Sequence, residues 1–247
     1  MRRFLPALLA ACAWSAAPGV CTTARADDPP AEEGDAPAAE GTSEEDAAAA
    51  AAQADADLRE KLKARLKVEA TVSGGVADMT YSFLHGTELD DFEVKGYDLS
   101  DLKETGSWTL GAGSRGAGAA THKLELAGDF TIELDVVVKH NTPSALLAFV
   151  LNRKVAVLWG QQLVKTSGFK PWDRKSAAPD VTIFREERRA SFKIERKGDT
   201  LSLEVNRRPM GSHTFKKGEL DEVRLSIVAQ NIRFLLGPVR IKGKPAS

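Results

Sequence analysis

Beyond its first 26 residues, this 247-residue chain has no cysteine, few aromatic residues and no long apolar run. The two cysteines are Cys12 and Cys21, and aromatic residues make up 6% of the chain. The rest of the chain therefore has no disulfide, no thiol catalyst and no cysteine metal ligand. No stretch approaches the roughly 18 apolar residues of a membrane span, so we expect none. A formal net charge of −1 gives no general attraction to nucleic acid.

Metal-ligand patterns are absent as well. The four histidines are scattered along the chain without ligand spacing, and a Ca²⁺ site would need clustered oxygen ligands. The close acidic pairs, Asp90-Asp91 and Asp98 with Asp101, fit helix or turn capping better than metal binding. We therefore predict no metal site and no cofactor. The histidines are His85, His122, His140 and His213.

Residues 1–26 have the three parts of a signal peptide. Basic Arg2-Arg3 precede the uncharged stretch 4–20, and Ala24-Arg25-Ala26 matches the small-x-small cleavage rule. The sequence therefore predicts export to the periplasm or the outside of the cell. Leu9-Ala10-Ala11-Cys12 also matches a bacterial lipobox, which would make Cys12 a lipid anchor. Cleavage there would leave a very short apolar core, which favours the soluble product.

Two low-complexity segments follow. Residues 27–43 are rich in Asp, Glu, Ala and Pro, which cannot bury enough apolar surface to offset chain entropy, so we expect a disordered acidic linker. Residues 44–70 are Ala-rich, with acids first and bases last, which favours a helix over about residues 44–68. Its apolar stripe is one leucine wide. We therefore expect a solvated stalk rather than a core helix. The stripe consists of Leu58, Leu62 and Leu66.

The near-zero net charge hides two opposite halves. Residues 27–60 contain 12 acids and one base, whereas residues 61–247 contain 30 bases and 23 acids. An acidic arm thus precedes a basic domain. The arm either folds back to screen the domain or only aids solubility, and low-complexity composition favours the second.

From residue 76 onward the pattern changes to strands. Residues 130–139 alternate apolar and polar side chains, which is typical of a half-buried strand. Residues 191–195 and 201–206 alternate in the same way around Gly198-Asp199, a hairpin signal. This hairpin would pair Lys193 with Glu204, Ile194 with Leu203 and Phe192 with Val205. Other strands are expected at 146–151, 155–159, 223–228, 232–236 and 239–241. Many short strands predict an antiparallel β-sandwich.

Several segments resemble the concanavalin A-like lectin/glucanase superfamily, in particular its laminin G-like and 3-keto-disaccharide hydrolase-like domains. The resemblance covers about residues 76–244. It implies an all-β jelly roll of two antiparallel sheets, one of them concave, with glycans bound on that face or at its rim. The segments that carry it are Tyr81–Phe83, Leu89–Val94, Gly106–Trp108, Leu110-Gly111, Gly128–Asp135, Phe192–Asn206 and Gly237–Lys242.

One expected strand contains part of a catalytic motif. Its Glu133-Leu134-Asp135 resembles the start of the Glu-x-Asp-x-x-Glu strand of laminarinase-type glucanases. Retaining hydrolysis needs two carboxyl groups about 5 Å apart. The second Glu is replaced by Val138, or by Val137 if the spacing is counted tightly. The sequence therefore favours polar residues on the exposed side of a strand over catalysis.

The longest irregular stretch, 160–178, holds the better binding candidates. Sugar rings stack on aromatic side chains, and loops of mixed aromatic and polar residues often carry function. Trp172 follows a proline and is flanked by charge, so we expect it to be exposed. Trp159 shares a strand face with Val155 and Val157 and fits core packing as well. The predicted ligand-binding set is Trp172, Trp159, Gln161, Asp173 and Arg174.

A second candidate surface is basic. Arg224, Arg233, Arg240 and Lys242 lie opposite the apolar sides of their strands. If these strands share a sheet, they form either an ordinary solvated face or a binding face for an anionic glycan or an acidic protein.

The leading hypothesis is therefore an exported, non-catalytic carbohydrate-binding or interaction domain. The alternatives are a glycoside-processing hydrolase that resembles the 3-keto-disaccharide hydrolases and a protein-binding adhesion or scaffold module. The hydrolase would need converging carboxylates or a metal. The binding domain would need an exposed aromatic residue on the concave face, and the scaffold would need an exposed apolar patch and no cleft.

Overall fold

The computed structural model describes residues 44–83, 86–98, 109–112, 117–152, 156–160, 164–167 and 189–246. The predicted signal peptide (1–26) and acidic linker (27–43) lie outside these ranges. None of the helices described is long and apolar enough to span a membrane. The elements are α1 (Glu44–Arg65), β1 (Thr71–Ser73), β2 (Val76–Tyr81), the 3₁₀ helix η1 (Gly86–Asp91), β3 (Phe92–Lys95), β4 (Tyr97–Asp98), β5 (Thr109–Ala112), β6 (Ala117–His122), β7 (Leu126–Val150), β8 (Ala156–Gly160), β9 (Val164–Ser167), β10 (Arg189–Lys197), β11 (Thr200–Val205), β12 (Arg208–Thr214) and β13 (Ser226–Pro245).

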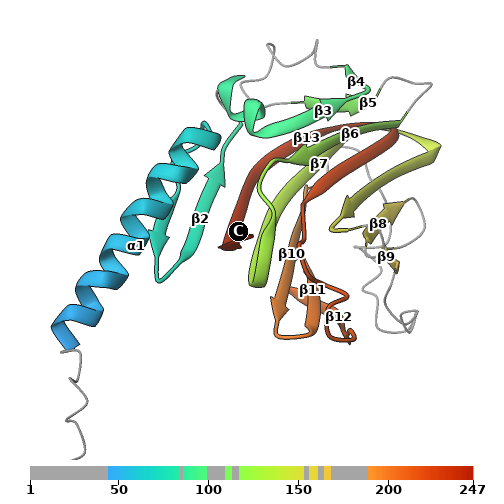
Figure 1. Cartoon of the computed structure of the whole chain (residues 1–247). Coiled ribbons are helices and arrows are strands. Elements are labelled where there is room, and N and C mark those ends of the chain that lie inside the picture. Colours follow the sequence, from blue (N-terminus) through green and yellow to red (C-terminus); the bar gives the residue numbers. More distant parts are fainter. Residues whose placement is uncertain are drawn as a thin grey trace, which may run out of the picture. The chain divides into compact units, whose positions relative to one another are not determined.

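Two long strands, β7 and β13, organise the domain. They pair with each other in antiparallel fashion from Leu126–Pro245 at one end to Val150–Ser226 at the other. The part of this pairing near Leu126 and Pro245 belongs to one layer, in which the strand order is β1-β2-β13-β7-β10-β11-β12. Their other half pairs with β6 and β8, which continue to β3 and β9. Figure 1 shows both strands curving from one layer into the other, so that one hydrogen-bonded sheet forms both layers.

The expectation of separate short strands was wrong for these two elements. The predicted strand 130–139 and residues 146–150 of the next one belong to the single strand β7, and residues 226–245 form the single strand β13. The register of β13 shifts between Gln230 and Ile232 and between Leu236 and Val239. Such bulges interrupt the alternation without ending a strand, and a bulge also tolerates Pro238.

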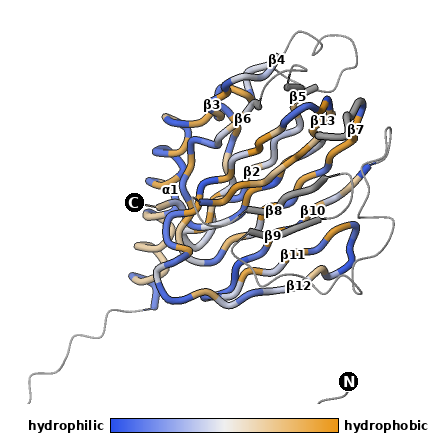
Figure 2. Tube along the Cα trace, turned by 90° about the vertical axis from the view of Figure 1, so that its right-hand side faces the viewer, coloured by the Kyte–Doolittle hydropathy of each residue, from blue (hydrophilic) through white to orange (hydrophobic). Residues whose placement is uncertain are grey.

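The hydrophobic core lies between the two layers. Ile132, Leu134 and Val136 of β7 are buried, and apolar and polar residues alternate along the strands (Figure 2). Phe149 of one layer meets Phe192 of the other, edge to face, with ring centroids 4.8 Å apart. The predicted all-β antiparallel sandwich is therefore confirmed.

The predicted β10–β11 hairpin is confirmed residue by residue. Lys193 lies opposite Glu204, Ile194 opposite Leu203 and Phe192 opposite Val205. Apolar partners of this hairpin all face the core, where Ile194 and Leu203 are buried. A shift of one residue would turn every one of them toward solvent, which fixes the register.

Helix α1 matches the predicted span but is only partly a solvated stalk. Its first residues are exposed, whereas Leu62 and the following Leu66 join the core, with 2% and 5% of their surface exposed. The Asp55 carboxylate accepts hydrogen bonds from the N–H groups of Gly74 and Gly75, both at 2.7 Å. Those glycines form the turn between β1 and β2 with positive φ angles.

A buried polar network closes the end of the domain where α1 leads into the sheet. Fully buried Asp91 accepts hydrogen bonds from the N–H groups of Lys67 (2.6 Å) and Val68 (3.0 Å). The Tyr81 hydroxyl lies 2.7 Å from His122 Nε2. Burial, followed by the charge and hydrogen bond of Asp91, raises the pKa of Tyr81.

His122 is neutral within this network. The Leu124 N–H donates to His122 Nδ1 at 3.1 Å, so that Nδ1 is an acceptor and Nε2–H donates to Tyr81. Burial lowers the pKa of His122 to about 4. Every described polar group here has a partner, which is the arrangement that a buried site requires.

Candidate functional site

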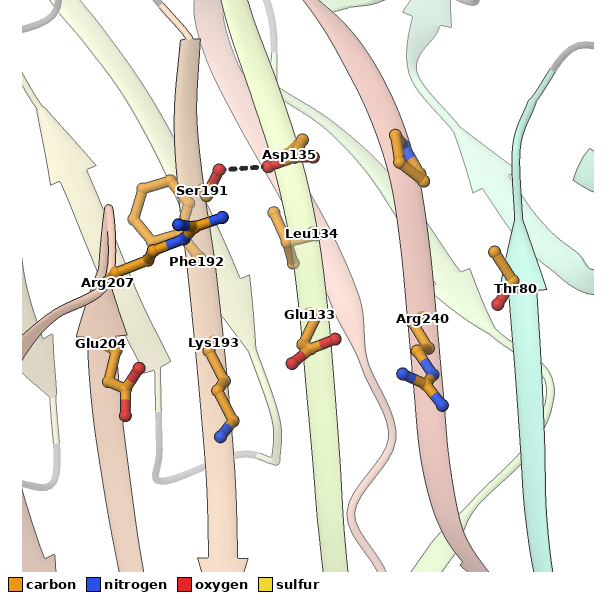
Figure 3. A pocket seen from close by; sticks show the side chains of 11 residues that line it. Thr80, Glu133, Leu134, Asp135, Ser191, Phe192, Lys193, Glu204, Arg207 and Arg240 are labelled. Carbon is orange, nitrogen blue, oxygen red and sulfur yellow. Dashed lines mark hydrogen bonds between the residues drawn. The ribbon is translucent and has the colours of Figure 1, made fainter.

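The outward-facing residues of five adjacent strands form a row of alternating charge. The register pairs Lys193 with both Glu204 and Glu133, and it pairs Arg240 with both Glu133 and Thr80. Because register partners in a sheet share a face, all five side chains lie on the face opposite the core. Figure 3 shows them side by side in the order Glu204, Lys193, Glu133, Arg240, Thr80.

A cavity of about 420 Å³ opens over this row and extends to Asp135, Ser191 and Arg207. The bulge of β13 between Leu236 and Val239 lies at this end of the cavity, and Pro238 of the bulge lines it. A Cβ atom at Gly237 would lie 2.9 Å from the Asp135 Cβ, closer than two carbons can approach. The bulge thus needs glycine at position 237.

A second hollow of about 180 Å³ continues from the first. It shares Glu133, Lys193 and Arg240 with the larger cavity and ends at Thr131 and Lys242. The shared residues form the row between the two hollows. Together, the two hollows therefore run along the strand direction, past the outward-facing residues Thr131, Glu133 and Asp135 of β7.

Several charged groups around the cavity are held by partners. Asp135 accepts hydrogen bonds from the Ser191 hydroxyl and the Arg189 guanidinium (Figure 3 shows the first). Arg240 forms a two-bond ion pair with Asp78, at 2.9 Å and 2.5 Å. The hydrogen bond from Arg240 lowers the pKa of Asp78, and the same bond raises the pKa of Arg240. These groups are fixed in place.

The two remaining carboxylates are available. Glu133 and Glu204 are half-buried, and neither has a hydrogen bond or ion pair to another described residue. Lys193, between them, has its Nζ 3.8 Å from Glu195, at the edge of ion-pair distance. The two carboxylates can accept hydrogen bonds from a ligand, and the Lys193 ammonium has three N–H donors, so it can donate to the same ligand while it faces Glu195. Such groups suit a ligand that carries many hydroxyls.

The cavity is polar rather than aromatic. Of its apolar lining residues, Leu134 and Phe192 are only 2% exposed and Pro238 is exposed, so the lining offers no open aromatic ring face. Among the described residues, no three His, Cys, Asp or Glu side chains form a group that could hold a metal ion. Recognition here would depend on hydrogen bonds and charge.

Comparisons with known proteins place the fold. No protein-family model matches the chain, and no curated protein matches it. Among solved structures, the metal-free carbohydrate recognition domain of Emp46p is similar with a TM-score of 0.50 and 14% identity over 68% of this chain and 96% of that one. A Bacillus subtilis protein of unknown function with a galectin-like fold gives a TM-score of 0.50 and 8% identity over 68% and 95%.

A third similar structure comes from endo-acting O-glycanases that prominent members of the human gut microbiota express to initiate mucin breakdown. Its TM-score is 0.50 with 9% identity, over 66% of this chain and 97% of that one. This chain has the concanavalin A-like fold. The identities are low, so the likeness concerns the fold alone.

Within the concanavalin A-like domain, most of the predicted ligand-binding loop lies outside the described residues. This applies to Gln161, Trp172, Asp173 and Arg174. The backbone of Trp159 is in β8, opposite Leu147 and Val164, but its side chain is not described. Ligand binding by these residues stays a prediction.

The predicted basic face is divided among different places. Arg240 and Lys242 lie two residues apart on β13, beside the cavity. Arg233 is farther along β13, opposite His140 and Gly111, where the strand enters the other layer. Arg224 precedes β13 and forms an ion pair with Glu125. The structure thus brings only two of these four residues together, and a role for them in binding stays a prediction.

The sequence reading missed that the exposed side of β7 is hollow. Alternation along the strand predicts that Glu133 and Asp135 share a polar face, and the hairpin predicts the Lys193–Glu204 pair. The sequence pattern does not predict the strand order, which places β13 and β10 on either side of β7. The Gly237-Pro238 pair inside an alternating run was the one local signal of a bulge.

Proposed function

We propose that the charged cavity on the β2-β13-β7-β10-β11 face binds a carbohydrate. The observation that carries this proposal is a pair of carboxylates, Glu133 and Glu204, that have no hydrogen bond or ion pair to another described residue. They lie on either side of Lys193 in a hollow where Asp135 and Arg240 are already paired. Sugars offer adjacent hydroxyls that donate to carboxylates and accept from ammonium groups. A carbohydrate recognition domain among the similar folds supports the same class of ligand.

A glycan array tests the proposal. The full exported chain and its Glu133→Ala and Glu204→Ala variants are compared, with Glu93→Ala as the matched control, because Glu93 is an exposed strand glutamate of β3 that does not line the cavity. Loss of a hydrogen bond to a charged group costs about 1.5–3 kcal/mol, so binding falls at least tenfold in both cavity variants. The control binds as the parent does.

The loop prediction supplies the competing outcome. If Trp172→Ala abolishes binding while Glu133→Ala and Glu204→Ala retain it, the ligand lies on the 160–178 loop and the cavity proposal is wrong. If the parent binds no glycan but captures a defined protein ligand, the scaffold alternative replaces it.

A hydrolase is the second candidate, because Glu133 and Asp135 line one cavity. Two observations favour binding instead. Asp135 is engaged by Ser191 and Arg189. Val138, at the position of the second catalytic glutamate, is fully buried. Incubation of the parent chain with each array-positive oligosaccharide decides the matter: intact sugar supports binding alone, and cleaved product that disappears in Glu133→Gln supports the hydrolase.

Export is also part of the proposal. Cleavage after Ala26 would give a mature chain that starts at Asp27. Mass spectrometry of the protein recovered from the producing cells tests this. A lipid-modified amino terminus at Cys12 would replace the soluble product with an anchored one.

A further inference from the structure

The turn between β11 and β12 has an unusual residue at its second position. Asn206 and Arg207 form a two-residue hairpin loop, and both have positive φ angles, 51° and 64°. Asn is well suited to this region, but the second position of such a loop strongly favours glycine. A long side chain held there costs free energy, and such strain is often found at ligand sites.

This turn is held against β10, at the cavity. The Asn206 side-chain oxygen accepts a hydrogen bond from the Ser191 N–H at 2.9 Å, and the Asn206 N–H donates to the Ser191 carbonyl at 2.8 Å. Ser191 in turn donates its hydroxyl to Asp135. Arg207 thus starts from a fixed backbone, and Figure 3 shows its guanidinium beside Ser191 at the Asp135 end of the cavity.

Arg207 is also the unengaged cation at this end. It is exposed and has no hydrogen bond or ion pair to another described residue. The neighbouring arginines are occupied, Arg189 by Asp135 and Arg240 by Asp78. The carboxylates Glu133 and Glu204 lie in the next row, so Arg207 faces the cavity at one end and hydrogen-bond acceptors lie farther along it.

We propose that Arg207 binds a carboxylate or sulfate group of an acidic glycan, an inference that rests on the proposed carbohydrate site. The planar guanidinium presents paired N–H donors that match either group. Glu133 and Glu204 accept hydrogen bonds from hydroxyls of the same sugar, away from its anionic group. The excess of basic residues after residue 60 adds a long-range field that attracts anionic ligands.

The test uses an array in which each carboxylated or sulfated oligosaccharide is paired with its neutral parent sugar. The full chain is compared with Arg207→Gly, Arg207→Lys and, as a matched control, Arg208→Gln on the adjacent strand. We expect the parent to prefer acidic glycans, and Arg207→Gly to lose that preference by about tenfold while it keeps binding of the neutral sugars. Arg207→Lys keeps part of the preference, because it keeps the charge without the paired donors.

Thermal unfolding separates binding from structure. Arg207→Gly removes the backbone strain, so its Tm equals or exceeds that of the parent. Comparison of the carboxylated with the sulfated oligosaccharides shows which of the two groups Arg207 binds. Equal binding of acidic and neutral glycans by the parent and Arg207→Gly overturns this inference and leaves the carbohydrate site standing. Absence of any glycan binding overturns both.

Discussion

Two polar clusters in this domain differ in how completely their groups are paired. In the buried network, Asp91, Tyr81 and His122 each have partners from neighbouring elements. In the cavity, Glu133 and Glu204 form no hydrogen bond or ion pair with another described residue, although Glu133 interacts electrostatically with Arg240. Buried polar groups without partners are costly, so the first cluster serves the fold. The second is partly solvated and can keep groups free for a ligand.

The difference predicts that substitutions in the two clusters have opposite effects. A change in the buried network should lower stability and leave carbohydrate binding intact. A change in the cavity should do the reverse. The four variants and conditions below follow from this contrast.

Asp91→Ala should have the largest effect on stability. It leaves the N–H groups of Lys67 and Val68 without an acceptor and removes the charged partner of Tyr81. At about 1–3 kcal/mol for each buried donor, we expect the free energy of unfolding to fall by about 4 kcal/mol. Urea unfolding measures it. A loss under 1 kcal/mol would show that the network is not structural.

Acid should weaken the fold through His122. Burial lowers its pKa from 6.5 to about 4, so between these values the unfolded chain binds a proton that the folded chain does not. The free energy of unfolding therefore falls as the pH falls through this window, by about 2 kcal/mol between pH 7 and pH 5. Urea titrations at both pH values measure the change. In His122→Asn the free energy of unfolding should hardly change between pH 7 and pH 5. The same pH dependence as in the parent would show that His122 is not its cause.

Gly237→Ala should affect both properties moderately. The added methyl lies 2.9 Å from the Asp135 Cβ, so β13 must shift at the bulge that opens the cavity. We expect about 1–2 kcal/mol of destabilisation together with weaker glycan binding. Gly128→Ala is the comparison, since its Cβ would meet no atom within 4 Å and only its left-handed φ of 65° strains an alanine there. Weakened binding in both variants would exclude a specific effect at the cavity.

Glu204→Gln should hardly change stability. Its side chain has no partner among the described residues, so we expect a change below about 0.5 kcal/mol in the free energy of unfolding. Binding on the glycan array should still fall. A large loss of stability would mean that Glu204 has a structural role.

The sequence predicted those features that depend on neighbouring residues. Alternation at 130–139 and the Gly198-Asp199 turn determine the β10–β11 pairing, because one residue of slippage would expose Phe192 and Leu203. The length of β7 and β13 was not predictable in this way. Bulges at Gln230–Ile232 and Leu236–Val239 break the alternation, and a broken pattern has the same appearance as a strand end.

The site required information that no local pattern contains. Glu133 and Arg240 are 107 positions apart in sequence, and they become neighbours only because β13 returns beside β7. Helix α1 shows a similar limit. Its single leucine stripe indicated solvation, but the hydrogen bonds that Asp55 accepts from the N–H groups of Gly74 and Gly75 attach it to the β1–β2 turn.

Amide chemical shifts of the full ¹⁵N-labelled chain, titrated with the strongest array glycan, show whether the ligand binds in the cavity. Binding there should shift the amide signals of Glu133, Lys193 and Glu204 and leave those of Tyr81 and His122 unchanged. Shifts confined to residues 161–174, with the cavity unchanged, would contradict it.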